Sequence, residues 1–588
     1  MKHDFTSIPD RSKFGSAKWN GAKNASVEYV PLSVADMEFP TAKPIVDDIK
    51  KLADEAILGY TSPTEEYNDA VISWMKRRHN FDIKKEWIIQ TPGVINALSL
   101  LIEATTKPGD GVIIMSPVYY PFDVTVLARS RRAVYCPLIN TGDRYEINYT
   151  ELEEKAKSAK NTAILFCNPH NPIGRVWTKE ELEKVADICC NNGVFIIDDE
   201  IHNDLIMPGY THTVMATVNE KTKNNIAVCT APSKTFNLAG LQCSNIIIPN
   251  DNIRARAEAC NKINMQMHLN IFAYTACTSA YNKCEDWLDE LITVIADNAK
   301  CVEDFMAEKF PEIKVYPLEG TYLQWLDMRS LGMTHCELRE MLEGANIYLD
   351  NGEMFGALGR GFQRINLACA KSTLEKMLVR FENAVNEVRA KWAAEGKPYH
   401  QTLTVGETLE GFVYNSAKGN DRKLEETIKK NTLIVFARYY ECEITQKILT
   451  LLKTAYPLLK AAGCDIKVVM QSDIGTISYA QTKYPFELIS DKDAVLYDRY
   501  NIFEADSAVN LAAGDRLFEA AVGKDIKKIF NTEIFRSYMN PNSGNGKREL
   551  QLCAFVAVDP EMNVIYSHYC KTIADFPNIK ELAEGLKS

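Results

Sequence analysis

The sequence predicts an α/β protein with two domains, and three observations support this prediction. Short apolar runs alternate with amphipathic helical stretches through roughly the first 390 residues. A polar stretch with scattered glycines follows, and a new α/β pattern begins at about residue 431. A chain of 588 residues is also too long for one ordinary domain. We therefore predict a first domain over 1–395, a linker and entrance to the second domain over 396–430, and a second domain over 431–588.

Five near-continuous apolar runs predict the strands of the first domain. The runs are "GVIIMS" (111–116), "TAILFC" (162–167), "VFIID" (194–198), "IAVCT" (226–230) and "NIIIP" (245–249). Strands covered on both faces read as continuous apolar runs rather than as alternating ones. The helix between the second and third runs has a capping box in Thr178 and Glu181 and ends at Asn192-Gly193. The pattern predicts a parallel or mixed sheet with helices packed on it.

Composition and charge exclude several classes of protein. A net charge of −11 and the lack of a basic run argue against nucleic-acid binding. No stretch approaches eighteen uninterrupted apolar residues, and the opening residues lack an apolar signal segment. We therefore expect a cytoplasmic protein without a membrane partner. The sixteen cysteines form no C-x-x-C pair, so we predict no metal site and mostly reduced thiols.

Polar and aromatic residues follow several predicted strands, at the end where α/β sheets bind their ligands. These residues are Tyr119 in "SPVYYPF" (116–122), Asn171 in "CNPHNPIGR" (167–175), and Asp199 and His202 in "IIDDEIHNDL" (196–205). A turn before a helix in "QTPGVINALSLLIEA" (90–104) exposes the backbone N–H groups of Gly93, Val94 and Ile95, which suit a phosphate. Lys234 follows another buried run, where a lysine either reaches water or serves chemistry that needs an amine.

These segments resemble the fold-type I pyridoxal-phosphate (PLP) enzymes, the aminotransferase class I/II superfamily, and most closely its MalY/PatB-type cystathionine β-lyases (C–S lyases). The resemblance covers roughly residues 5–392. It is carried by "SAKWN", "VADMEFP", "GYT", "NPHNPIGR", "DDEIHNDL", "SKTFNLAGLQ", "GTYLQWLD" and "GRGFQRINLA". It implies a large mixed-sheet domain with a small α+β domain, the cofactor pyridoxal 5'-phosphate, and a homodimer whose active sites are shared between subunits.

The resemblance also assigns the main roles. Lys234 matches the lysine that bonds the cofactor and then acts as the base at the substrate Cα. Asp199 matches the carboxylate that keeps the pyridine nitrogen protonated, and Asn171 matches the residue that bonds the ring hydroxyl. Tyr119 is expected to stack on the ring and to take part in catalysis. Arg364 resembles the arginine that binds the substrate α-carboxylate, a task that suits a bidentate guanidinium.

Four further positions follow from the same resemblance. Ser233 would help the turn after Thr91 to hold the phosphate, and Tyr60 would reach a phosphate across the dimer interface. His202 stands where many aminotransferases have a tyrosine near the cofactor. Gln242 replaces the arginine that many aminotransferases carry eight residues after the lysine, as the lyase-like branch leads one to expect.

The function predicted on this basis is cleavage of the Cβ–S bond of cystathionine or related S-substituted cysteines. The products are a thiol, pyruvate and ammonia. The spacing of the residues does not separate this elimination from transamination, so an aminotransferase acting on neutral or aromatic amino acids is the alternative. A second alternative is a regulatory protein whose second domain binds a partner.

The second domain resembles thioredoxin-like proteins, particularly the peroxiredoxin-like (AhpC/TSA) group. The resemblance lies in "NTLIVFARYYECEITQKILTLLKTAYPLLKAAGCDIKVVMQS", "YPFELISDKDAVLYDRYNI" and "AFVAVDPEMNVIYSHYCKTIADFP". Cys442 stands where a reactive cysteine would be, after a strand and near a helix N-terminus. Thr445 replaces the second cysteine of a dithiol motif. Cys442 is therefore either a one-cysteine redox site or a structural cysteine.

Overall fold

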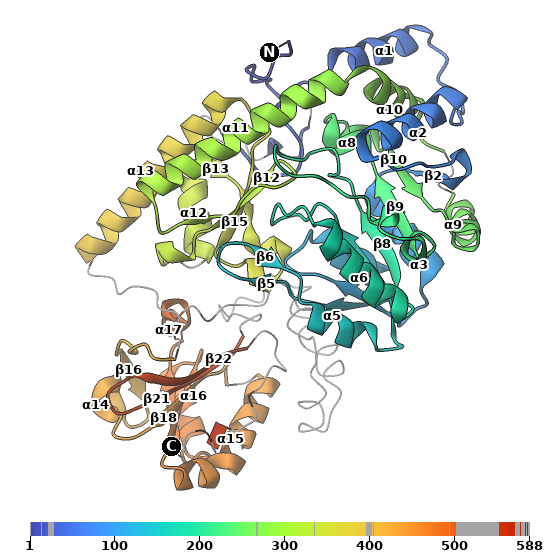
Figure 1. The fold of residues 1–588 in the computed structure, drawn as a ribbon. Helices are drawn as coiled ribbons and strands as arrows, with labels where there is room; N and C mark the ends of the chain where they lie inside the picture. Colours follow the sequence, from blue (N-terminus) through green and yellow to red (C-terminus); the bar gives the residue numbers. More distant parts are fainter. Residues whose placement is uncertain are drawn as a thin grey trace. The chain divides into compact units, whose positions relative to one another are not determined.

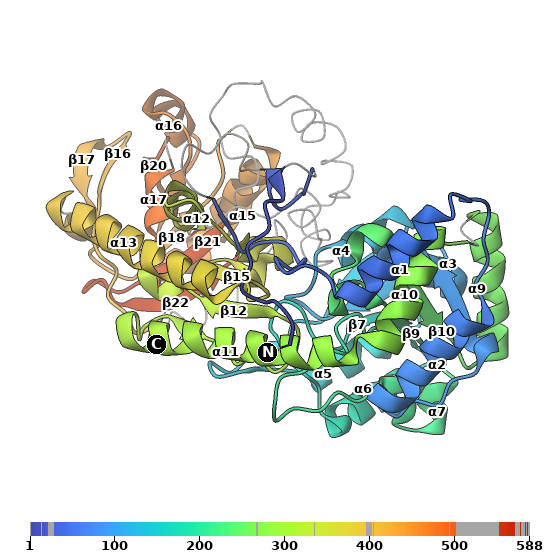
Figure 2. The same ribbon diagram turned by 90° about the horizontal axis from the view of Figure 1, so that it is seen from above.

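The computed structural model describes residues 2–12, 15–20, 29–265, 268–333, 335–395, 403, 405–440, 442–492, 494–500, 502 and 552–570, with 577, 582, 583 and 585. The chain divides into two compact units, Met1–Lys391 and Trp392–Ser588, and each is described by itself. Figures 1 and 2 show their elements from two directions.

The first unit is built on a seven-stranded mixed sheet with the order β2-β10-β9-β8-β7-β3-β4. Its strands are β2 (Ile88–Thr91), β3 (Gly111–Ile114), β4 (Arg132–Tyr135), β7 (Asn161–Cys167), β8 (Phe195–Asp199), β9 (Ile226–Thr230) and β10 (Ser244–Ile247). β4, β3, β7, β8 and β9 are parallel, whereas β10 is antiparallel to both of its neighbours. All five predicted runs form strands of this sheet.

Helices cover both faces of this sheet, which explains the continuous apolar runs. α3 (Val94–Thr105) packs against β7–β10, while α5 (Tyr149–Ala156) contacts β7 and α6 (Lys179–Asn191) contacts β8. Figures 1 and 2 show α6 and α3 on opposite sides of the strands. The Thr178–Glu181 capping box starts α6, and Asn192 caps its end, as the sequence predicts.

A smaller sheet, β11-β12-β15-β14, accompanies the main one. Its strands are β11 (Lys314–Val315), β12 (Leu323–Asp327), β14 (Asp350–Asn351) and β15 (Phe362–Asn366). Two separate two-stranded pairs are β1 (Val30–Pro31) with β13 (Ile347–Tyr348) and β5 (Ile139–Asn140) with β6 (Tyr145–Glu146). The remaining helices are α1 (Lys43–Asp54), α2 (Glu65–His79), α4 (Pro121–Ala128), α7 (Glu220–Lys223), α8 (Pro232–Thr235), α9 (Asp251–Ile263), α10 (Ile271–Lys283), α11 (Glu285–Lys309), α12 (His335–Gly344) and α13 (Lys371–Glu395). In the described ranges of both units, no helix is long and apolar enough to cross a membrane.

The second unit contains another seven-stranded sheet, with the order β17-β16-β20-β19-β18-β21-β22. Its strands are β16 (Val413–Ser416), β17 (Gly419–Lys423), β18 (Thr432–Phe436), β19 (Asp465–Met470), β20 (Glu487–Ser490), β21 (Ala554–Val558) and β22 (Val564–Tyr569). Its helices are α14 (Leu424–Thr427), α15 (Glu443–Ala461), α16 (Ile474–Gln481) and α17 (Val495–Arg499). β18, β19 and β20 are parallel, and the other pairings are antiparallel.

Residues 413–423 form two strands of this second sheet, within the range over which the sequence predicts the linker and domain entrance. β16 and β17 form a hairpin at the edge of the sheet, and α14 follows them. Only one face of β16 is buried, and β17 is almost wholly exposed. An edge hairpin of this kind lacks the apolar run that reveals a central strand.

Candidate active site

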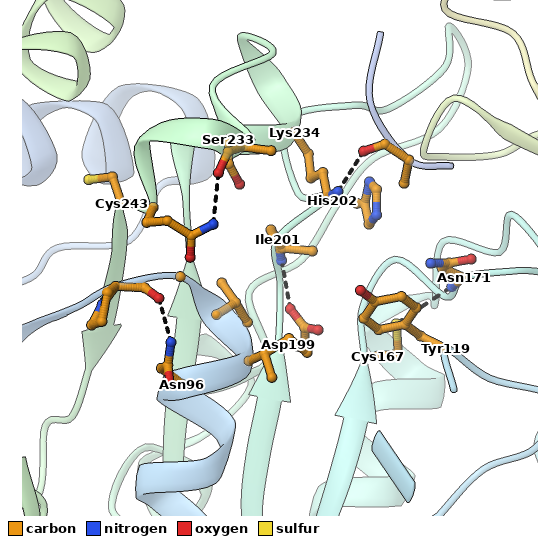
Figure 3. Close-up of a pocket in the computed structure, with 17 residues that line it drawn as sticks. Asn96, Tyr119, Cys167, Asn171, Asp199, Ile201, His202, Ser233, Lys234 and Cys243 are labelled. Atoms are coloured by element: carbon orange, nitrogen blue, oxygen red, sulfur yellow. Dashed lines mark hydrogen bonds between the residues drawn. The ribbon is translucent and has the colours of Figure 1, made fainter. Parts of the chain in front are cut away.

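The candidate site lies where the parallel strands of the first unit end. β7, β8 and β9 run in the same direction, so the residues after them meet at one edge of the sheet. The residues that line the pocket there include Pro92, Gly93, Val94, Ile95, Asn96, Tyr119, Cys167, Asn171, Asp199, His202, Ser233, Lys234 and Gln242. Figure 3 shows Lys234, His202, Asp199 and Tyr119 around this common cavity.

Lys234 lies in α8, directly after β9, and its side chain enters the pocket. Its Nζ donates a hydrogen bond to the backbone carbonyl of Ala35 at 2.6 Å. The hydroxyl of Tyr322 donates to the same carbonyl at 2.9 Å. Burial, reinforced by the positive charge of Arg364, lowers the pKa of Lys234 to about 8. A substantial fraction of the amine is therefore neutral close to physiological pH.

Asp199 is the last residue of β8 and lies buried at the bottom of the pocket. Its Oδ1 accepts the backbone N–H of Ile201 at 3.2 Å. Burial raises the pKa of Asp199 to about 7, while this hydrogen bond and the charge of Lys234 act in the opposite direction. Asp198 precedes it on the strand and does not line the pocket, as the alternation of side chains requires.

Tyr119 and Asn171 lie on the side of the pocket away from Ser233 and Asn96 (Figure 3). The backbone N–H of Tyr119 donates to the carbonyl of Asn171 at 3.1 Å, which ties the two loops together. Burial raises the pKa of the Tyr119 hydroxyl to about 12, so it stays protonated at neutral pH. The Oδ1 of Asn171 accepts a hydrogen bond from Nη1 of Arg364 at 2.7 Å. Arg364 therefore lies next to the pocket, in β15 of the smaller sheet.

His202 is buried, and its ring packs edge-on against Tyr322 with the centroids 5.9 Å apart. Burial lowers the pKa of His202 well below its usual value, and the charges of Lys234 and Arg364 act in the same direction. The imidazole is therefore neutral. Its Nδ1 has no hydrogen-bond partner among the described residues.

A small cup lies at the N-terminus of α3. Gly93 precedes the helix with φ +88°, and a Cβ there would come within 2.9 Å of Oε1 of Gln242. Val94 and Ile95, in the first turn of α3, line the pocket, and the N–H groups of a first helical turn are the ones that bind anions. Ser233 lines the same region, whereas Tyr60 is fully exposed and does not line the pocket.

The residues of this pocket fit pyridoxal 5'-phosphate. The cup at the N-terminus of α3 suits a phosphate, and Tyr119 provides an aromatic ring that lines the same pocket. The carboxylate of Asp199 is buried and accepts only the Ile201 N–H within the described part of the chain, which leaves it ready to accept a ring N–H. Lys234 supplies an amine that burial keeps partly neutral.

The structure also brings in groups to which sequence reasoning gave no role. Ala35 lies in "VADMEFP" and Tyr322 in "GTYLQWLD", two motifs noticed in the sequence without a function for either residue. Cys167 and Asn96 also line the pocket. Cys243 borders it, but Figure 3 shows its sulfur turned away from the cavity, and the Sγ lies 3.8 Å from the Tyr67 hydroxyl.

Comparison with known proteins agrees with this geometry. The family model of aminotransferase class I and II matches residues 27–381. Cystathionine β-lyase PatB of Bacillus subtilis is 38% identical over 386 residues, which cover 65% of this chain and 100% of that protein. The crystal structure of cystalysin from Treponema denticola, which contains a pyridoxal 5'-phosphate cofactor, aligns with a TM-score of 0.65 and 45% identity, over 66% of this chain and 100% of that one. The PLP-bound C–S lyase from Staphylococcus hominis aligns with a TM-score of 0.61 and 29% identity, over 66% of this chain and 99% of that one.

Proposed function

Because the chain belongs to the aminotransferase class I and II family, we propose that its first unit is a PLP-dependent carbon–sulfur β-lyase. Its substrate is cystathionine or a related S-substituted cysteine, and its products are a thiol, pyruvate and ammonia. The observation that carries this proposal is the buried pocket in which Lys234 and Asp199 occur together. Relatives named as cystathionine β-lyase and C–S lyase favour elimination over transamination.

The side chains of the pocket divide the reaction between them. Pyridoxal phosphate, when bound, supplies the electron sink that acidifies the substrate Cα–H. Asp199 would accept the N–H of the pyridine ring, and Asn171 and Tyr119 would help to hold the ring. The neutral amine of Lys234 takes the proton from the substrate Cα, and the Cβ–S bond breaks so that the sulfur leaves as a thiolate, which takes up a proton. Water then hydrolyses the released aminoacrylate to pyruvate and ammonia. Arg364 binds the α-carboxylate and orients the Cα–H bond toward Lys234.

Product analysis of the holoenzyme tests the proposal. With cystathionine as the only substrate, we expect equal amounts of pyruvate and thiol, because elimination needs no second substrate. Adding a keto acid is expected to leave the rate unchanged. Turnover that requires a keto acid would establish the aminotransferase instead. Absence of pyruvate under both conditions, with PLP bound, would favour the regulatory alternative.

We also propose that the enzyme is a homodimer whose subunits share their active sites. The loop between α1 and α2 supports this, because its apolar side chains face outward in the single chain. Ile57, Leu58 and Tyr60 are all exposed, and Tyr60 is completely so. A cluster of exposed apolar side chains on one loop is typical of a surface that another chain covers. Tyr60 would then reach the phosphate of the partner's cofactor.

For the second unit we propose a thioredoxin-like fold of the peroxiredoxin-like group. The strand arrangement supports it: β18, α15 and β19 form a parallel strand–helix–strand unit, and the antiparallel pair β21 and β22 follows on the other side of β18. Cys442 is the residue before α15, at its N-cap. Its place at a helix N-terminus is one where reactive cysteines occur, whereas an exposed fraction of 6% favours a packing role.

Replacing Cys442 with Ser decides between these two roles. If Cys442 is a redox thiol that handles the released thiol or persulfide, the full-length variant is expected to lose peroxide consumption and to release its sulfur product more slowly. Cys464, a buried cysteine directly before β19, provides the matched control as Cys464→Ser. Unchanged peroxide consumption and product release in Cys442→Ser would identify a structural cysteine.

A further inference from the structure

One buried carboxylate beside the pocket has no role in the mechanism above. Asp350 is only 5% exposed and lies in the two-residue strand β14. The register of the small sheet places it directly opposite Arg364 of β15. Residues that face each other across antiparallel strands interact through their side chains, and here the pair is an acid and a guanidinium.

The contacts of Arg364 leave its guanidinium little freedom. Asp350 Oδ2 accepts hydrogen bonds from Nε, at 3.1 Å, and from Nη2. Asn171 accepts one from Nη1, and the ring of Phe355 covers the guanidinium with its centroid 4.7 Å from Cζ. Of the five N–H groups of an arginine, these contacts use three. Within the described ranges, one N–H therefore remains on each terminal nitrogen, and these two nitrogens bind a carboxylate end-on.

The other oxygen of Asp350 holds the backbone on the lysine side of the pocket. Its Oδ1 accepts the N–H of Val34 at 3.2 Å. Val34 has φ +53°, a left-handed conformation that is strained for a β-branched residue and that needs support from its surroundings. The next residue, Ala35, presents the carbonyl that receives Lys234 Nζ. A single carboxylate therefore contacts both Arg364 and the turn that contacts Lys234.

We propose that Asp350 is a positioning residue that orients Arg364 to bind the α-carboxylate of the amino-acid substrate. The inference rests on the proposed function of the pocket. An arginine side chain without this partner has several rotamers, and most of them direct the terminal nitrogens away from the substrate. Asp350 also balances the charge of Arg364, so that the geometry of the guanidinium, rather than a net positive charge, determines which ligand binds.

The test compares two ligands that differ only in the group that Arg364 would bind. L-alanine has the α-carboxylate, and L-alaninamide lacks it. The affinity of the holoenzyme for each is measured from the change in absorbance of the bound cofactor. The wild-type protein is expected to prefer alanine. In Asp350→Asn and Asp350→Ala, this preference should fall by about tenfold or more, the value of a hydrogen bond to a charged group. The loss should be smaller in Asp350→Asn, which retains an acceptor oxygen.

The control is a second aspartate–arginine pair, which lies at the end of strand β12 of the same small sheet and in the turn that follows it. Asp327, at the end of β12, accepts from Nε of Arg329 at 2.8 Å and from its Nη2 at 2.6 Å. Asp327→Asn should leave the preference for alanine unchanged. If Asp350 had a purely structural role, its replacement would weaken the binding of both ligands equally, and this result would overturn the proposal. A preference for alanine that stays the same or increases in the variants would also overturn it. A wild-type protein without any preference would overturn both this proposal and the substrate class proposed for the pocket.

Discussion

Replacing Lys234 with alanine is expected to lower kcat/KM for C–S cleavage by about 10⁴-fold or more, because the variant loses the general base of the reaction. In the described part of the chain, Lys234 is the only lysine that lines the pocket. His202 is neutral and lies beside Lys234 in Figure 3, but its ring is packed against Tyr322.

Two further measurements, one on the variant and one on the wild-type apoprotein, test the same role of Lys234. A small primary amine added to Lys234→Ala should restore part of the activity, since it can enter the space that the side chain leaves. In the wild-type apoprotein, PLP uptake should slow by about tenfold for each pH unit below about 8, because burial places the pKa of Lys234 there and only the neutral amine bonds the cofactor.

Lys223→Ala is the control, since this lysine lies on α7 and pairs with Glu220 at the surface. It should keep the wild-type rate. If Lys234→Ala retained a tenth of the wild-type activity, Lys234 would not be the base of the reaction, and the proposed assignment of the pocket would be wrong.

Much of the main sheet and many of the pocket residues could be predicted from the sequence. Strands that are buried on both faces leave continuous apolar runs, and parallel strands bring their following residues to one edge. Asn171 and Lys234 follow such strands, Asp199 is the last residue of another, and all three lie in one pocket. A pattern along the chain was sufficient because sheet topology turns sequence order into spatial proximity.

The rest depends on contacts that no local pattern records. The partner of Lys234 is the backbone carbonyl of Ala35, and a backbone atom has no residue type by which to recognise it. The pairing of Asp350 with Arg364 depends on the register of a two-residue strand, which is too short for a periodic signal. The second contact of Asp350, with the backbone N–H of Val34, joins residues that are 316 positions apart in the chain.

The second large effect is expected at Asp199. Replacing it with asparagine should lower kcat/KM by about 100- to 1000-fold, the typical loss when one electrostatic partner of the reacting group is removed. An amide has no negative charge, so it no longer stabilises the proton on the pyridine nitrogen of the cofactor. Affinity for PLP should fall as well, because a charge-assisted hydrogen bond is replaced by a neutral one. The measurements are steady-state kinetics on the PLP-saturated variant and a PLP titration of the apoprotein.

Asp198→Asn is a closely matched control, because Asp198 is the neighbouring residue of the same strand and is equally inaccessible. Burial and the nearby carboxylate of Glu200 raise the pKa of Asp198 well above its usual value. Asp198 therefore favours its neutral form more than an exposed aspartate does, so an amide is a closer substitute for it. We expect Asp198→Asn to keep near-normal kinetics and PLP affinity. If both variants lost activity equally, the loss would come from disturbance of β8, and the role of Asp199 as the partner of the pyridine nitrogen would be refuted.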